Sequence, residues 1–488
     1  MERPQNMRRG YADSGRRMDR LLGEQIFSRV AGTRMVGGNA IRLLRDASEN
    51  YPAWLAAIEA AGQRIDFENY IVTADPAGAR FADALIARAR SGVRVRLLYD
   101  WLGCLTKAGP GFWRRLREGG VEIRCFNPPS LASPFDWLNR NHRKTLSIDG
   151  RIGFVAGLGV GSVWQGDAAR RIPQWRDTGI ELRGPVIADL EAAFEQSWRM
   201  AGSAGAEIAP VVPELGSADA GNVMMSVIPS QPRTMGLYRL DQLIAAVARR
   251  SLWLTDAYFV GTTAYVRALC DAARDGVDVR LLVPGSSDLP GVKALSRAGY
   301  RPLLEAGIRV FEWNGSMLHA KTAVADTSWA RIGSSNLNLA SWIGNWELDI
   351  AVEYAGFAEE MEAMFLEDLT NSTEIVLDLG KVQPSIARKT MEPRKAGRRR
   401  RGARRGSVGR LAAGVVGLGN TVGAMITNHR ALGPAEAKVM AATGCLLLLL
   451  AAVAIVLPRL VTVPLAALGL WIGVALLIRA WQLRSVSR

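Results

Sequence analysis

The sequence predicts an α/β fold in which two tandem α/β/α units pair as a pseudo-dimer, followed by a C-terminal transmembrane helical hairpin. Two observations predict this organisation. A His-x-Lys-x-x-x-x-Asp motif occurs twice, each time after a similar succession of strand-like and helix-like segments. Near the C-terminus, two apolar runs are each about long enough to cross a ~30 Å hydrocarbon core as helices.

The duplication extends well beyond the motif. In the first half, a strand-like segment at 67–71 precedes a helical stretch that ends at Gly92, and another strand-like run follows. In the second half, a strand-like segment at 255–259 precedes a helical stretch that ends at Gly276. Each half therefore reads strand, helix, glycine cap, strand, helix, glycine cap, strand. Two such units in one chain predict a single site at the seam between them.

Composition divides the rest of the chain. Lys and Arg number 61 against 46 for Asp and Glu, and much of the excess lies in a block at 388–410 that contains one acidic residue. Such a block cannot form a core, so a solvated basic linker is expected. We expect a basic N-terminal segment, a first unit, a connector, a second unit, a polybasic linker and a membrane-associated tail, at residues 1–36, 37–200, 201–222, 223–377, 378–410 and 411–488.

The tail carries the predicted hairpin at about 439–478. Its apolar runs at 439–457 and 460–478 are separated only by Pro458 and Arg459, and basic residues flank both outer ends. The positive-inside rule then places both ends and the α/β units on the cytoplasmic face. The alternative, a buried helical pair in a soluble protein, fits poorly with such long runs and so few charges. The Gly-rich segment 411–427 is not counted as a span, and no signal peptide is expected.

The two motifs supply the candidate catalytic residues. A two-step displacement at phosphorus needs two histidines, because one attacks and the other gives and takes the proton. Two lysines would neutralise the non-bridging oxygens of the transition state. The candidate catalytic residues are His142, Lys144, Asp149, His319, Lys321 and Asp326.

Each motif is followed by a turn of small residues and, later, by a carboxylate. Asn336 would add an amide donor to the phosphate, and a late carboxylate would fix the tautomer of a histidine through its Nδ1. The candidate phosphate-binding or orienting residues are Ser334, Asn336, Asp177 and Glu347. Asp149 and Asp326 each precede a turn, so a structural role is equally open for them.

Neither a metal nor another cofactor is expected for this chemistry. Beyond the two motif histidines, the chain has one more, which stands alone, and its four cysteines lack metal-ligand spacing. Since the units are placed in the cytoplasm, the cysteines are expected to be free thiols.

The motifs and late carboxylates resemble the phospholipase D superfamily. The sequences at 141–144, 175–178, 318–321 and 333–336 look like those of the bacterial cardiolipin synthases, and the resemblance covers about residues 37–377. It implies phospholipase D-type units at a bacterial inner membrane that convert phosphatidylglycerol and a second phospholipid to cardiolipin and glycerol through a phosphatidyl-histidine. By this analogy His142 is the nucleophile and His319 the acid and base, although the residues alone leave the choice open. One departure is Gly159, where the family usually has Asn.

Three alternatives remain open. A phospholipase D would use water as the acceptor, a nuclease would cleave nucleic acid, and a membrane organiser would use only the polybasic tail. Nucleic acid is disfavoured as a partner because the basic block adjoins the hairpin and does not lie within either α/β unit. The expected partners are anionic phospholipids and the bilayer, and one chain already holds both halves of a site, so catalysis requires no oligomer.

Overall fold

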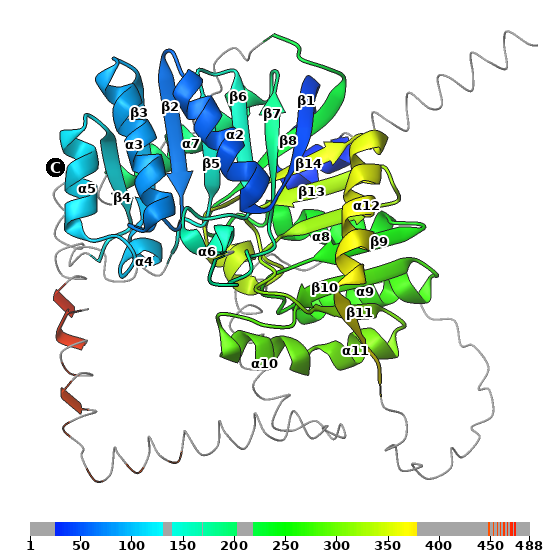
Figure 1. Cartoon of the computed structure of the whole chain (residues 1–488). Helices are drawn as coiled ribbons and strands as arrows, with labels where there is room; N and C mark the ends of the chain where they lie inside the picture. Colours follow the sequence, from blue (N-terminus) through cyan, green and yellow to red (C-terminus); the bar gives the residue numbers. More distant parts are fainter. Residues whose placement is uncertain are drawn as a thin grey trace, which may run out of the picture. The chain divides into compact units, whose positions relative to one another are not determined.

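The computed structural model describes residues 25–129, 139–167, 169–202 and 218–377, with isolated positions between 448 and 474 (Figure 1). The predicted hairpin, the polybasic linker and the segment 411–427 therefore lie almost entirely outside the described residues. Within the described residues, no helix combines the length and the apolar character needed to cross a bilayer.

Among the residues that the structure describes, one sheet of 15 strands runs through both halves (Figure 1). Its order is β15-β11-β10-β9-β12-β13-β14-β8-β1-β7-β6-β5-β2-β3-β4. The strands of the first half are β1 (Val36–Arg45), β2 (Arg64–Asn69), β3 (Arg94–Asp100), β4 (Glu122–Phe126), β5 (Lys144–Ile148), β6 (Ile152–Ala156) and β7 (Thr178–Arg183). Those of the second are β8 (Val223–Ser230), β9 (Ser251–Thr255), β10 (Asp278–Pro284), β11 (Arg309–Trp313), β12 (Thr322–Ala325), β13 (Trp329–Gly333), β14 (Glu347–Glu353) and β15 (Ser372–Ile375).

The sheet is symmetric in order about the pair β1 and β8. Reading outward from that pair, β1-β7-β6-β5-β2-β3-β4 corresponds to β8-β14-β13-β12-β9-β10-β11, and β15 adds one edge strand. The antiparallel pairing of β1 with β8 joins the halves, with Val36 opposite Met225. The pseudo-dimer predicted from the repeat is thus one continuous sheet made of two similar halves.

Helices cover both faces of the sheet. They are α2 (Asp46–Ala60), α3 (Pro76–Arg90), α4 (Trp101–Cys104), α5 (Pro110–Glu118), α6 (Ser162–Gln165), α7 (Ile187–Gly202), α8 (Gly236–Val247), α9 (Thr263–Arg274), α10 (Pro290–Ala298), α11 (Tyr300–Glu305) and α12 (Ala355–Thr370), with a short π-helix, η2 (Ala340–Gly344). The turns after α3 and α9 contain Gly92 and Gly276 in the left-handed region, with φ of 92° and 95°. The predicted glycine caps are therefore present at both positions.

One hydrophobic core is shared by the two halves. Leu190 of α7 and Phe357 and Met361 of α12 belong to the same cluster of buried side chains. Helix α7 also contacts β8, and α12 contacts β1, so each helix packs against a strand of the other half. Burial of this shared apolar surface holds the halves together.

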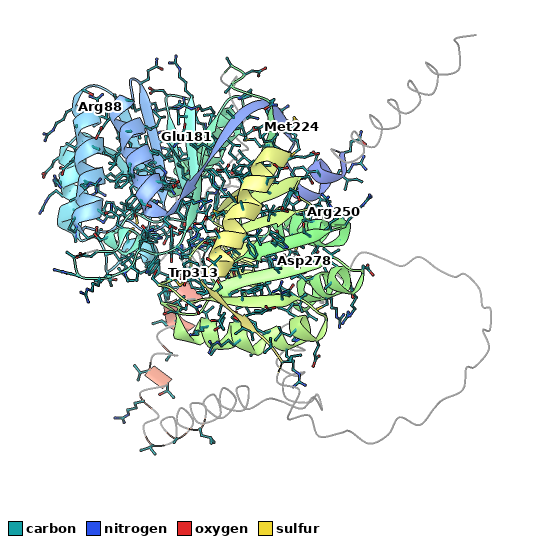
Figure 2. All side chains as sticks on the ribbon, turned by 45° about the vertical axis from the view of Figure 1, so that its right-hand side comes forward. Arg88, Glu181, Met224, Arg250, Asp278 and Trp313 are labelled. Atoms are coloured by element: carbon teal, nitrogen blue, oxygen red, sulfur yellow. The ribbon has the colours of Figure 1, made fainter. Side chains whose placement is uncertain are left out.

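The direction of the strands places both motifs at the carboxyl edge of the sheet. Strand β5 runs antiparallel to β2, which puts Lys144 opposite Asn69, the last residue of β2. In the second half, Thr322 of β12 lies opposite Thr255, the last residue of β9. In Figure 2, Asp278 at the amino end of β10 marks the edge of the second half away from the motif. Trp313 at the carboxyl end of β11 marks the edge that holds it.

Candidate active site

The histidine of each motif lies beside a segment of the other half, the one that contains Glu347 or Asp177. The backbone N–H of His142 donates to the carbonyl of Trp346 at 2.8 Å, and that of His319 donates to the carbonyl of Arg176 at 2.7 Å. Both contacts are short parallel bridges that link the halves. The site is therefore built where the two halves cross: each half contacts the other through one such bridge.

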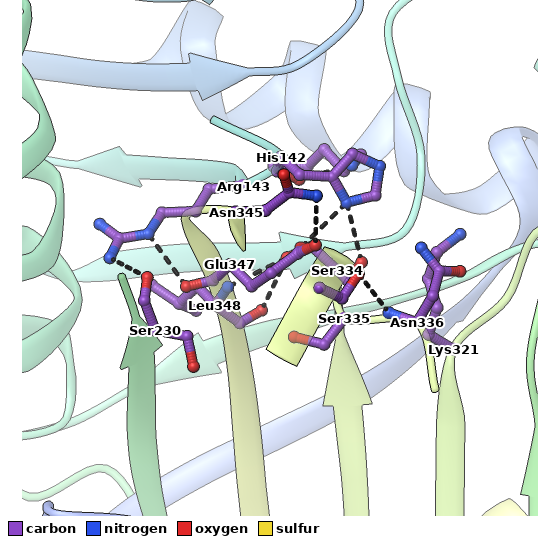
Figure 3. Close-up of polar contacts among 12 residues, drawn as sticks. His142, Arg143, Ser230, Lys321, Ser334, Ser335, Asn336, Asn345, Glu347 and Leu348 are labelled. Atoms are coloured by element: carbon purple, nitrogen blue, oxygen red, sulfur yellow. Dashed lines mark hydrogen bonds and ion pairs between the residues drawn. The ribbon is translucent and has the colours of Figure 1, made fainter. Parts of the chain in front are cut away.

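These crossings pair each histidine with a carboxylate from the opposite half. The Nδ1 of His142 lies 2.9 Å from Oε2 of Glu347. A dashed line marks this contact in Figure 3. The Nδ1 of His319 lies 2.8 Å from Oδ2 of Asp177. A carboxylate at Nδ1 fixes the ring orientation and the tautomer, so Nε2 is the nitrogen that can reach a phosphorus atom.

The two lysines lie beside the histidines. The ammonium of Lys144 donates to the carbonyl of His142 at 2.5 Å. The ammonium of Lys321 donates to the carbonyl of His319 and lies 3.0 Å from its Nδ1. All four side chains are buried.

Burial sets the charges of these groups. It lowers the pKa of Lys144 to about 7 and also lowers the pKa of Lys321. It lowers the pKa of His142, and that of His319 to about 4, with the lysine charges adding to the effect and the paired carboxylates opposing it. Lys321 acts on His142 and Lys144 on His319, so the charges of the two halves belong to one site.

The paired carboxylates remain anionic despite full burial. Burial alone would raise the pKa of Glu347, yet His142 and Lys144 hold it below its usual value. His319 and Lys321 do the same for the pKa of Asp177. Without a substrate, the site therefore contains fixed anions behind histidines that are neutral at pH 7, with lysines whose charge depends on what binds.

The small turn after the second motif supports this geometry. The hydroxyl of Ser334 donates to Oε2 of Glu347 at 2.6 Å, and the carbonyl of Ser334 lies 3.0 Å from Nδ1 of His142. The backbone N–H of Asn336 donates to Ser341 at 3.2 Å, while its buried Oδ1 has no hydrogen-bond partner within the described structure. Ser334 therefore orients the Glu347 carboxylate, and the Asn336 amide is available to a ligand (Figure 3).

The corresponding turn in the first half differs because a tryptophan occupies the space. A Cβ added at Gly159 would lie 2.4 Å from Cη2 of Trp164. The Nε1 of Trp164 donates to the same Asp177 oxygen that His319 contacts, at 3.2 Å. Gly159 thus makes room for an indole that helps to orient Asp177.

The structure does not bring Asp149 and Asp326 to the histidines, which corrects their prediction as catalytic residues. The Asp149 carboxylate accepts backbone N–H groups of Gly62, Gln63 and Arg64 at 2.7–2.8 Å. The Asp326 carboxylate does the same at 249–251, just before and at the start of β9. Each aspartate lies at the far end of its strand, roughly 15 Å from the motif lysine at ~3.3 Å per residue.

Backbone conformation explains why an aspartate stands at those two positions. Asp149 and Asp326 have φ of 54° and 53°, and the residues after them, Gly150 and Thr327, also have positive φ. Positive φ at two successive central residues is the pattern of a type I′ turn, which favours Asp at the first of them. The turns are closed by the backbone N–H of Arg151 and of Ser328, which donate to the carbonyls of Ile148 and Ala325. The motif aspartates therefore lock a turn to the start of a neighbouring strand.

Sequence reasoning missed two tyrosines that face the motif residues. The ring of Tyr70 lies 4.8 Å from that of His142 and 5.3 Å from the Lys144 ammonium. The ring of Tyr258 lies 5.9 Å from both His319 and the Lys321 ammonium. The two tyrosines occupy similar places in the strand-like segments 67–71 and 255–259, and this repetition could have identified them as site residues.

Two buried arginines that sequence reasoning also missed connect the halves. Arg143 donates to the carbonyl oxygens of Glu347, Ala193 and Ser230 at 2.8–3.2 Å. Arg176 of the first half makes a bidentate pair with Asp368 of α12 at 2.8 and 2.9 Å. Each arginine is adjacent in sequence to a histidine or carboxylate of the site.

The arrangement defines a class of enzyme. Two buried histidines, each oriented by a carboxylate, with two lysines and an amide between two similar halves, form a phosphoryl-transfer site of the phospholipase D type. In the part of the chain that the structure describes, no cluster of three or more His, Cys, Asp or Glu could hold a metal ion.

Comparisons with known proteins identify the family. A family model described as cardiolipin synthase, PLD-like domain, matches residues 54–198 and 241–369. Cardiolipin synthase A of Pseudomonas aeruginosa (strain LESB58) is 35% identical over 369 residues, which cover 74% of this chain and 73% of that protein. A cardiolipin synthase of Alkalihalophilus pseudofirmus is 34% identical over 375 residues, covering 75% and 74%. The chain belongs to the cardiolipin synthase family of phospholipase D-like enzymes, and it is a phosphatidyltransferase of that type.

A solved structure supports the fold. The phosphatidylserine synthase of Haemophilus influenzae aligns with a TM-score of 0.56 at 14% identity, covering 71% of this chain and 90% of that one. At this identity the likeness concerns the fold alone.

Proposed function

We propose that the chain transfers a phosphatidyl group from one phosphatidylglycerol to the headgroup hydroxyl of a second, giving cardiolipin and glycerol. The observation that carries the proposal is the pair of reciprocal contacts, His142 with Glu347 and His319 with Asp177. They supply two equivalent and oriented imidazoles, which is what a displacement with a covalent intermediate requires.

In the first step, Nε2 of one histidine attacks the phosphorus. The anionic lipid raises the pKa of the second histidine on binding, so that this histidine takes up a proton on Nε2 as an imidazolium paired with its carboxylate. The P–O bond to the glycerol headgroup then breaks, and the departing oxygen takes that proton from Nε2 of the second histidine. A phosphatidyl-histidine and free glycerol result. We propose His142 as the nucleophile and His319 as the acid, because the family resemblance supports that order.

In the second step, a headgroup hydroxyl of another phosphatidylglycerol gives its proton to the second histidine. Its oxygen attacks phosphorus, the P–N bond breaks, and cardiolipin leaves. Lys144 and Lys321 would stabilise the charge on the non-bridging oxygens, with Asn336 as an amide donor. The anionic lipid would raise the lysine pKa values again on binding, since an opposite charge favours the cationic form.

The predicted tail supports a place for this reaction at the inner face of a bacterial-type cell membrane. A hairpin at about 439–478 would anchor the chain, and the polybasic linker at 378–410 would attract anionic lipid at about 1 kcal/mol per basic residue near the surface. The anionic phospholipids of the bilayer are the partners proposed.

The proposal is tested by mass spectrometry of lipids from phosphatidylglycerol vesicles. Wild type, His142→Ala and His319→Ala are incubated in parallel, each after its folding has been checked. Cardiolipin and glycerol in equal amounts from wild type alone are expected. Phosphatidic acid as the main product would overturn the synthase and leave a phospholipase D, because water would then be the acceptor.

A second substrate tests the order of the histidines. With a p-nitrophenyl ester of phosphatidic acid, the leaving group needs no acid. His319→Ala should therefore form a phosphoramidate on the peptide that contains His142, seen as a mass increase after digestion under alkaline conditions. A phosphoramidate at His319 in the His142→Ala variant would reverse the order.

A further inference from the structure

Large apolar side chains are exposed around the edge of the sheet that holds the two histidines. They lie in the segments that follow strands ending at this edge: α4 and the residue after it follow β3, α6 and the loop after it follow β6, the segment before α10 follows β10, and the residue before η2 follows β13. Figure 1 places α4, α6 and α10 along the lower left of the two halves. The exposed residues are Leu102, Leu105, Val163, Ile172, Leu289 and Leu339, here named the apolar rim.

The rim belongs to the surroundings of the site. Gly103 of α4 packs against the backbone of Tyr70, whose ring contacts His142. On the other side, the hydroxyl of Tyr258 donates to Asp288 at 2.7 Å, next to Leu289 in sequence. Rim segments of both halves therefore adjoin the two tyrosines whose rings lie next to His142 and His319.

Cations lie among the rim residues. Lys107 follows α4, and Arg170 and Arg171 directly precede Ile172; all three are exposed. A surface that alternates apolar side chains with Lys and Arg is the composition that binds the interface of an anionic bilayer. A buried protein interface would instead be depleted of lysine at its core.

We infer that the apolar rim seats the carboxyl edge of the sheet in the headgroup region of an anionic bilayer. The inference rests on the proposed function and deepens it. A diacyl lipid keeps its chains in the bilayer while its phosphate reaches two histidines that are only 9% and 5% exposed. The rim side chains contact acyl chains, the cations contact lipid phosphates, and the substrate moves into the site without leaving the membrane.

A probe of local depth tests this in the full chain, because overall vesicle binding would also report the tail. Leu105→Cys, Ile172→Cys and Val247→Cys are each labelled with the fluorophore NBD and reconstituted into vesicles of phosphatidylglycerol and phosphatidylcholine. Val247 is the matched control: it is 53% exposed, as Leu105 is, but it lies just before the amino end of β9. Wild type labelled in the same way gives the background from native thiols.

The expected result is a blue-shifted NBD emission at positions 105 and 172 that lipids with a spin label near the headgroup quench, while position 247 stays in water. The shift should weaken in vesicles of phosphatidylcholine alone. Equal emission at 105 and 247 would overturn the inference. A blue shift in detergent-free protein that grows with protein concentration, without vesicles, would also overturn it by assigning the rim to a second copy of the chain.

An activity comparison separates failure of the rim from failure of the proposed function. Leu105→Asp with Ile172→Asp is assayed on phosphatidylglycerol vesicles and on monomeric short-chain phosphatidylglycerol. Turnover on vesicles should fall at least tenfold more than turnover on monomers, and Val247→Asp should change neither. Equal losses of turnover on both substrates would overturn the proposed role of the apolar rim at the bilayer. No cardiolipin from wild type on either substrate would overturn the proposed function.

Discussion

The Nδ1 of His319 lies 2.8 Å from the carboxylate of Asp177, although 142 residues separate them in the chain. The matching pair, His142 and Glu347, spans 205 residues in the same manner. Each catalytic histidine proposed here is therefore oriented by a residue of the other half, and neither half holds a complete site.

Asp177→Asn should lower kcat by about 10²–10⁴-fold in a folded protein, because an amide neither stabilises the imidazolium nor selects the tautomer. Glu347→Gln is the matched change on the other histidine. Steady-state cardiolipin formation measures both. If both variants kept more than a third of wild-type kcat, the carboxylates would have no role in orienting the histidines.

Gly159→Asn should reduce activity even though it brings in the residue usual in the family. The new side chain would displace the Trp164 indole, which would lie 2.4 Å from its Cβ, and Asp177 would lose a donor. Adding Trp164→Ser copies the second half, where Ser341 stands at the corresponding distance after Asn336. The double variant should therefore recover kcat relative to Gly159→Asn, and a further loss would contradict this account of the turn.

Asp149→Ala and Asp326→Ala should destabilise the fold by about 1–3 kcal/mol each, because each leaves backbone N–H groups without an acceptor. Their kcat at a temperature where they remain folded should stay within about threefold of wild type. Denaturant unfolding and cardiolipin formation are the two measurements. A hundredfold loss of kcat in a folded variant would return these aspartates to the chemistry.

The pH dependence of kcat/KM should report Lys144, whose pKa burial lowers to about 7. Above that pH the free enzyme loses the cation, so kcat/KM should fall toward tenfold per pH unit. Lys144→Gln should have a lower kcat/KM than wild type, and its kcat/KM should no longer show the fall above about pH 7 that deprotonation of Lys144 causes. A wild-type profile that is flat to pH 9 would show that the ammonium remains charged in the free site.

The lowered pKa of Lys144 also determines how this residue's contribution to the free energy of unfolding changes with pH. Between the folded pKa of about 7 and the unfolded value of 10.5, the unfolded chain binds more protons at Lys144. The contribution of this residue to the free energy of unfolding must then rise with pH across that window. Chemical denaturation of wild type and Lys144→Gln at several pH values should show a difference that changes in this direction.

Arg143→Met should destabilise the chain by about 3 kcal/mol or more, because the buried guanidinium satisfies three carbonyl oxygens from both halves. Arg114→Met, at an exposed arginine of α5, is the control and should change stability by no more than about 0.5 kcal/mol. Thermal unfolding of both variants measures the difference. Equal midpoints would contradict a joining role for Arg143.

The sequence alone was sufficient for the repeat, the α/β class and the pairs His142 with Lys144 and His319 with Lys321. These features are local: hydrophobic periodicity, glycines such as Gly92 and Gly276, and motif spacing all act over a few residues. The family resemblance also followed from short motifs, and the comparisons confirm it.

Only the tertiary structure decided which carboxylate pairs with which histidine. The motif spacing groups Asp149 with His142, yet a five-residue strand carries the carboxylate to the opposite edge of the sheet. The partner of His142 is Glu347, which only the crossing of the two halves brings close. Trp164 and Arg176 gain their roles in the same way, through contacts that no local pattern encodes. Sequence spacing reports neighbours along the chain, whereas the chemistry depends on neighbours across a sheet that two halves build together.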